Sequence, residues 1–249
     1  MMSKSVRWQA GVLLLLLLCL PLALRAQMSK HDQDAAKKMI AGTLYLRLDV
    51  PLNYVQGAWG LGPEALLEVS PTGHDAIRKI SLLDAKKEGR SHVIWALFPN
   101  DGVRYGKLSF DHDKIEIWME GLQIRDLEIK IDFVQIKSLD DFTKAFNQTF
   151  SKVPLQDEHP EWSAEVRNAI AEHRLVVGMT KEQAFDVVGT PLDMNTEQEN
   201  GAKVETWRPR QDKGDMGVIL GWRAKSNSLR VTGFPSQLKF VDGKLQVIG

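Results

Sequence analysis

Alternation of apolar and polar residues between positions 43 and 136 places the strongest limit on the fold. In the segment "TLYLRLDVP" the apolar positions are Leu44, Leu46 and Leu48, and the same period of two returns at 127–133. This period is typical of a strand with one buried face. Several short strands between turn residues predict an antiparallel sandwich or barrel. The pattern lacks the strand–helix–strand rhythm of a doubly wound sheet, so a Rossmann-type fold is disfavoured.

The period changes to 3.6 residues after Ser138, which predicts a helix. Ser138 is followed three residues later by Asp141, a start that resembles a capping box. Apolar side chains then recur on one helical face, at Leu139, Phe142, Phe146 and Phe150. We therefore predict an α+β chain whose first domain, 43–153, is rich in strands and is closed by this helix.

Two polar segments flank the β-rich domain. Residues 27–42 form a polar lead with a weak apolar patch, predicted to be either mobile or a short helix. Residues 154–160, "PLQDEHP", contain two prolines and little that a core could bury, so they are the predicted linker. A second domain of α+β type is expected over 161–249.

The N-terminus has the features of an export signal. Basic residues at Lys4 and Arg7 precede an apolar run over 12–24, and Ala26 is a small residue at its end. These features predict a signal peptide over 1–26, cleaved near Ala26, and a periplasmic or secreted protein. The run is shorter than the roughly 20 residues that span a bilayer, although an uncleaved anchor is the alternative.

Cysteine content and charge exclude several kinds of site. Cys19 is the only cysteine and lies inside the apolar run after Leu18, where a lipid-attachment signal needs a small residue. Its removal with the signal would leave no disulfide, thiol nucleophile, cysteine–zinc site or iron–sulfur cluster. Lysine plus arginine and aspartate plus glutamate are 32 each, with no basic block, so nucleic acid is not an expected partner.

The segment 176–193, "VVGMTKEQAFDVVGTPLD", predicts one short helix with strong end signals. Thr180 and Gln183 form a capping box, and Gly178 before it suits a positive φ. Gly189 fits the left-handed C′ position, with Pro191 two residues later. A phosphate-binding loop is the alternative, but it needs Lys followed by Ser or Thr, and here Thr precedes Lys181.

This segment resembles the signature of the BamE family, also called SmpA/OmlA. In that family a Gly-Met-Thr-x-x-Gln-Val start and a Leu-Gly-x-Pro stop bracket a short helix. Later stretches are also similar: "VETWRPR", "MGVILGWR" and the terminal "SQLKFVDGKLQVIG", in which Asp242 and Gly243 form a tight-turn signal. The resemblance covers about residues 163–249.

The resemblance implies two helices packed on a small antiparallel sheet, within the wider β-lactamase-inhibitor-like group. It also implies a non-catalytic role through protein–protein contacts in the bacterial envelope, where BamE supports outer-membrane β-barrel assembly. Members are short and lipid-anchored. This chain lacks a plausible lipid-attachment site and carries more than a hundred residues before the similar region.

The sequence does not assemble a catalytic or cofactor site. Asp111, His112 and Asp113 could bind a metal, but their place between two predicted strands favours a turn. No nucleophile–base set can be identified, so we expect no enzyme and no cofactor. A hydrolase with an unrecognised site, and an inhibitor or small-ligand-binding module of the periplasm, remain alternatives.

Three tryptophans are the predicted protein-binding surface. Trp59 lies between glycines, Trp118 lies among glutamates on a strand, and Trp222 lies on a strand that could be an edge. Exposed tryptophans are frequent anchors of protein contacts. Packing inside a domain is the alternative for each.

Overall fold

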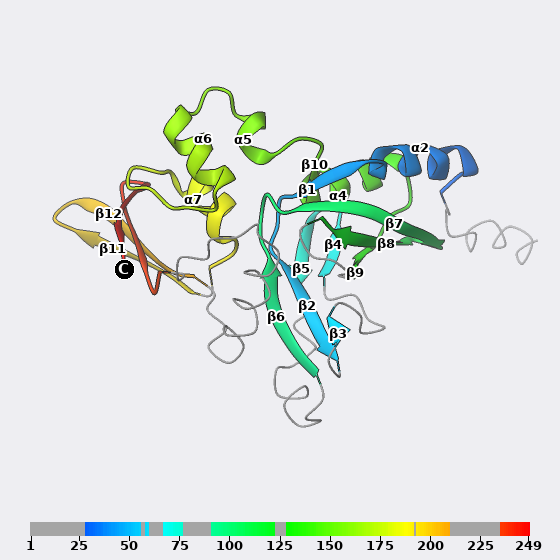
Figure 1. The fold of residues 1–249 in the computed structure, drawn as a ribbon, viewed down its shortest axis with the longest axis horizontal. Coiled ribbons are helices and arrows are strands. Elements are labelled where there is room, and N and C mark those ends of the chain that lie inside the picture. Colours follow the sequence, from blue (N-terminus) through cyan, green and yellow to red (C-terminus); the bar gives the residue numbers. More distant parts are fainter. Residues whose placement is uncertain are drawn as a thin grey trace, which may run out of the picture.

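The computed structural model describes residues 28–55, 58–59, 67–76, 91–122, 128–191, 193–209 and 235–249. Helices and strands are both present, so the α+β class is confirmed. The strands form a seven-stranded, a three-stranded and a four-stranded sheet. Figure 1 shows the four-stranded sheet at one end of the molecule and the seven-stranded sheet at the other.

The seven-stranded sheet is the framework of the first domain. Its order is β10-β1-β7-β8-β9-β4-β5. The strands are β1 (Thr43–Leu46), β4 (Leu67–Ser70), β5 (Gly73–Ala76), β7 (Gly102–Asp111), β8 (Lys114–Gly121), β9 (Glu128–Phe133) and β10 (Phe150–Ser151). The antiparallel prediction is wrong at one place, because β4 and β9 are parallel. The described pairings form an open series between β10 and β5, not a closed barrel.

A smaller sheet continues the ribbon formed by β1 and β7. Its order is β3-β2-β6, with β2 at Val50–Val55, β3 at Ala58–Trp59 and β6 at Ser91–Leu97. The register of β2 on β6 shifts between Val50 and Pro51. Proline lacks an N–H for the ladder and is tolerated at such irregularities.

Two helices supply the apolar layer of the first domain. They are α2 (Lys30–Ile40) and α4 (Leu139–Thr149), capped by Ser29 and Ser138. The Phe142 ring lies edge-on to that of Phe133 with centroids 5.6 Å apart, and both side chains are fully buried. Burying one such side chain stabilises the fold by about 1.5–3 kcal/mol. The polar lead is therefore a helix, with Ile40 in the same core.

The second domain consists of two helices on the four-stranded antiparallel sheet. The helices are α6 (Ala164–Ala171) and α7 (Lys181–Val188). The sheet order is β11-β12-β13-β14, with β11 at Asp193–Glu199, β12 at Ala202–Arg208, β13 at Leu238–Val241 and β14 at Lys244–Ile248. Trp207 and Phe240, with ring centroids 4.7 Å apart, lie in its core.

The predicted linker is structured. It contains the one-turn helix α5 (Leu155–Glu158), which lies between the two domains in Figure 1. Leu155 is buried, and its N–H donates to Asn100 Oδ1 of the first domain at 2.8 Å. The second domain therefore begins from a segment that is anchored to the first.

Candidate functional site

The helix signals of the segment 176–193 are present at α7. Gln183 N–H donates to Thr180 Oγ1 at 3.2 Å, and Thr180 N–H donates to Gln183 Oε1 at 2.8 Å. This reciprocal capping box satisfies two donors at the helix start. Gly178 has φ of 94°, as its place before the cap predicts. The motif residues thus organise the helix, as the capping interpretation requires.

Gly189 differs from its predicted conformation. It caps α7 with φ 69° and ψ −156°, so only the positive φ agrees with the left-handed C′ prediction. This combination is open essentially to glycine alone. A Cβ at Gly189 would lie 2.9 Å from Asp49 Cβ. The glycine is therefore required both by its backbone and by the close approach of the first domain.

Asp49 joins the two domains at this point. Its Oδ1 accepts hydrogen bonds from the backbone N–H of Thr190 at 3.0 Å and from the Thr190 hydroxyl at 2.6 Å. Thr190 lies between Gly189 and Pro191, so the stop signal of α7 is also a domain contact. Asp49 is 5% exposed, so these bonds are shielded from water.

Two further polar contacts lie along the junction. Arg47 Nη2 is 2.6 Å from Glu158 Oε1, which also accepts from the Ser151 hydroxyl at 2.6 Å. His173 Nε2, just after α6, is 3.6 Å from Asp101 Oδ1.

Asp186, on α7 at the same junction, has a carboxyl group with a raised pKa. Burial raises its pKa to about 7, and the neighbouring carboxylates of Glu182 and Glu158 act in the same direction. His159 and Arg47 oppose this shift. The Asp186 carboxyl therefore titrates near neutral pH, although no substrate-sized cavity is described beside it.

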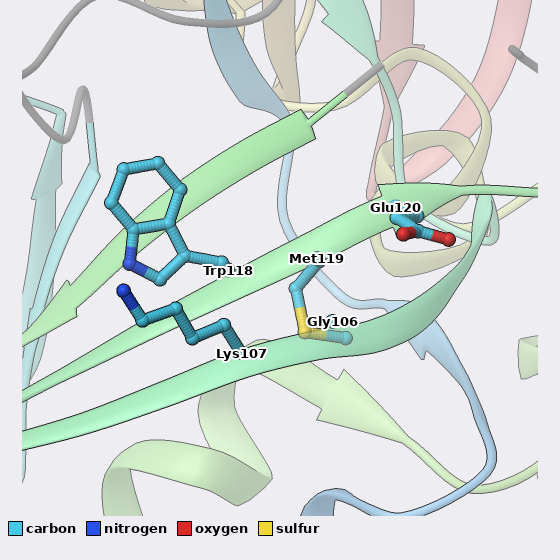
Figure 2. Close-up of a pocket in the computed structure, with 5 residues that line it drawn as sticks. All are labelled: Gly106, Lys107, Trp118, Met119 and Glu120. Atoms are coloured by element: carbon cyan, nitrogen blue, oxygen red, sulfur yellow. The ribbon is translucent and has the colours of Figure 1, made fainter. Parts of the chain in front are cut away.

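A cavity of about 290 Å³ lies on the seven-stranded sheet at β7 and β8. It is lined by Gly106, Lys107, Trp118, Met119 and Glu120. The register of β7 on β8 shifts between Tyr105 and Lys107, leaving Gly106 at a bulge. Figure 2 shows the Lys107 and Trp118 side chains extending alongside one another, with Glu120 at the other end of the site.

A charged network holds the Trp118 side of this cavity. Lys130 Nζ lies 5.4 Å from the Trp118 ring centroid and 2.8 Å from Glu116 Oε1. Lys114 Nζ contacts Glu116 and Asp132 at 2.9 and 2.6 Å. The hydrogen bonds from Lys130 and Lys114 hold the pKa of Glu116 below its ordinary value. The Trp118 indole thus has a cation–π contact with Lys130 of β9, whose ammonium group is itself paired with Glu116.

The predicted tryptophans do not form one described surface. Trp118 is partly exposed and lines the cavity. Trp59 is in β3, but its side chain is outside the described residues, as is all of Trp222. One feature of the sequence could have indicated the cavity: Gly106 lies inside an otherwise regular strand pattern, which is typical of a bulge.

The other candidate residues give no assembled reaction centre. His112 lies in the turn between β7 and β8, and its Nδ1 is 2.7 Å from Asp111 Oδ1. Within the described ranges, no three His, Cys, Asp or Glu side chains are grouped so that they could hold a metal ion. The predicted signal peptide and Cys19 lie outside these ranges.

No protein-family model, curated protein sequence or solved structure matches the chain. None of the described helices has the length and apolar character needed to cross a membrane.

Proposed function

We propose that this chain is an exported, non-catalytic protein of the bacterial envelope that acts through protein–protein contacts, in the manner implied by its resemblance to the BamE family. The observation that carries the proposal is α7, with its Thr180–Gln183 capping box and Gly189 stop. It packs with α6 on a four-stranded antiparallel sheet. Export and a role in envelope assembly rest on the signal-peptide features and on the resemblance.

The contacts at the junction between the domains support a function in which both domains act as one rigid unit. Asp49, Asn100 and Arg47 of the first domain are bonded to Thr190, to α5 and to Glu158. Buried and partly buried hydrogen bonds of this kind help to fix orientation, because breaking them leaves polar groups poorly hydrated. A partner would then meet a surface of fixed geometry.

Trp118 is the proposed anchor on the first domain. Its indole is held by Lys130 and borders a cavity with Lys107 and Glu120 at its margins. Tryptophans in such partly desolvated positions contribute most to many interfaces. The charged neighbours would select a partner of complementary polarity.

In-cell crosslinking of the full-length, C-terminally tagged protein tests the proposal. We expect at least one envelope protein to be enriched over a tagged, unrelated exported protein. Trp118→Ala should lower this recovery at least about fivefold. The matched surface change Lys144→Ala, at a side chain 57% exposed on α4, should not. No enrichment over the control would contradict the proposed function. Equal recovery by the Trp118→Ala and Lys144→Ala variants would show that Trp118 is not an anchor for the partner.

Binding of a small ligand in the cavity at Trp118 is the second candidate function. Its volume of about 290 Å³ is at the lower end of the range for small-molecule sites. A partly apolar wall and two charged side chains could orient a compact polar ligand. Native mass spectrometry of the purified protein should then detect a bound mass that Trp118→Ala removes, and a mass equal to the bare chain would argue against a tightly held ligand.

A further inference from the structure

The two edges of the four-stranded sheet differ in whether another part of the described chain covers them. At the β14 edge, Gly178 N–H donates to the Leu245 carbonyl and Leu245 N–H donates to the Met179 carbonyl, both at 2.8 Å. The chain before α7 therefore covers that edge. At the other end of the order stands β11, and no strand in the described part of the chain pairs with its outer side.

β11 has the properties of an edge that can accept another strand. All seven of its residues, Asp193–Glu199, are exposed. It pairs with β12 through seven consecutive residue pairs, so the edge is regular over its whole length. Natural edges are usually protected by short length, bulges, proline or charged side chains, and of these Asp193–Glu199 has only its three acidic side chains, which do not repel a basic strand.

The hairpin turn defines which backbone groups of β11 point outward. Asn200 and Gly201 have φ of 52° and 84°, as in a two-residue type I′ turn. In such a hairpin the flanking pair, Glu199 and Ala202, is hydrogen-bonded, and bonded pairs alternate along the ladder. The N–H and C=O groups facing away from β12 therefore belong to Met194, Thr196 and Gln198.

The same alternation separates the side chains of β11 by character. Met194 pairs with Trp207 of the core, so Met194, Thr196 and Gln198 lie on the helix-covered side of the sheet. Met194 is nevertheless 60% exposed. The opposite face carries Asp193, Asn195, Glu197 and Glu199, so every charge on β11 is acidic and lies on one face.

We propose that β11 is a docking edge for an extended segment of another protein, which adds to the sheet as an outer strand. The segment carries basic side chains beside Asp193, Glu197 and Glu199 and uncharged ones beside Met194 and Thr196. Strand addition obtains affinity from main-chain hydrogen bonds and specificity from alternate side chains. This inference rests on the proposed function, since it names the class of partner contact.

Charge favours this occupant over a second copy of the chain. In an antiparallel pairing of two copies centred on Thr196, Asp193 would face Glu199, and like charges directly opposite destabilise a strand pair. Arg208 and Lys239 do contact Asp193 and Glu199, at 3.2 and 2.9 Å. Those acidic side chains are 64% and 47% exposed, so such pairs contribute little and can be exchanged for partner cations.

The test uses the full mature chain and a fluorescent peptide, acetyl-Thr-Lys-Val-Arg-Val-Lys-Thr-amide. Thr196→Pro removes an outward N–H while sparing the bonds to β12, and it should weaken binding at least about tenfold. Thr196→Ala is the matched control and should bind within about twofold of the unaltered chain. The peptide should slow hydrogen exchange at the amides of Met194, Thr196 and Gln198.

A second variant covers the case in which Thr196→Pro does not fold. Glu197→Lys should weaken the basic peptide and strengthen a matched peptide with Glu in place of Lys and Arg. Equal binding by Thr196→Pro and Thr196→Ala, no charge preference, or no binding at about 1 mM would overturn the inference. So would a dimer of the unaltered chain that Thr196→Pro dissociates, because a second copy would then be the occupant.

In-cell capture with the same two variants separates this inference from the proposed function. A partner recovered by Thr196→Ala and lost by Thr196→Pro supports both. A partner recovered equally by the two variants contradicts the docking edge and leaves the function standing. If neither variant recovers a partner in cells, but the peptide still binds Thr196→Ala more tightly than Thr196→Pro, the proposed function is contradicted and the docking edge is supported.

Discussion

Asp49 Oδ1 accepts two hydrogen bonds from Thr190, one from its backbone N–H at 3.0 Å and one from its hydroxyl at 2.6 Å. The two residues are 141 positions apart and belong to different domains. Because Asp49 is buried, this contact ties the end of α7 to the start of β2. The motif that ends a helix in the second domain thereby also sets the position of the first.

Removal of this contact should destabilise the fold. Asp49→Ala leaves both Thr190 donors without this acceptor, and we expect a loss of about 1–3 kcal/mol in the free energy of unfolding. Asp49→Asn keeps an acceptor oxygen of the same shape and should lose less. Urea unfolding of the purified chain measures both, and equal losses would show that the hydrogen bonds to Thr190 contribute nothing.

Gly189 and Gly178 form a matched pair for backbone strain. Both have positive φ, but an added Cβ meets Asp49 only at Gly189, and nothing lies within 4 Å of one at Gly178. Alanine at Gly178 should cost about 1–2 kcal/mol through conformational strain. Alanine at Gly189 should cost at least about 1 kcal/mol more, because Asp49 must also move. Thermal unfolding compares them, and a smaller loss at Gly189 would contradict the packing described.

The capping box should contribute measurably to the second domain. Thr180→Ala removes the hydroxyl that accepts from Gln183 N–H, with an expected cost of about 1 kcal/mol. Thr180→Ser retains the hydroxyl and should remain close to the unaltered chain. Urea unfolding of the purified chain, followed by circular dichroism, is the measurement. Identical unfolding midpoints for the alanine and serine variants would show that the Thr180 hydroxyl does not stabilise the helix as a cap.

Asp186 predicts a specific dependence of stability on pH. Its folded pKa of about 7 is above the unfolded 3.8, so its stabilising protonation is fully present below 3.8 and is lost as pH rises through 7. Asp186→Asn should therefore match the unaltered chain near pH 4 and exceed its stability near pH 8, by on the order of 1–3 kcal/mol.

The exposed Asp157 on α5 provides the control for that titration. Asp157→Asn makes the same chemical change at an exposed side chain and should alter stability only slightly. Chemical unfolding across this pH range gives the comparison. A stability difference for Asp186→Asn that does not grow with pH would contradict the pKa assignment.

Local signals in the sequence predicted much of the second domain. Thr180 and Gln183 lie one helical turn apart and Gly178 is two residues before Thr180, so their roles follow from spacing alone. The Ser138 cap and the Phe142–Phe146 face of α4 are local in the same sense.

Long-range contacts were not predictable from the same patterns. The parallel pairing of β4 with β9 joins segments about 64 positions apart and leaves no trace in local periodicity. In the sequence, Leu155 is one apolar residue in a polar linker. In the structure it is buried, and its N–H donates to Asn100. The cavity at Trp118 depends on the bulge at Gly106, and a bulge shifts register across strands without changing either strand's composition.

Site-specific photocrosslinking in living cells tests the central claim most directly. A photoreactive residue would replace Trp118, Thr196 or, as a control, Lys144 on the exposed face of α4. The account predicts protein adducts of defined mass from Trp118 or Thr196 and none above background from Lys144. Absence of adducts from both surface positions, with the protein exported and folded, would contradict a role through protein–protein contacts.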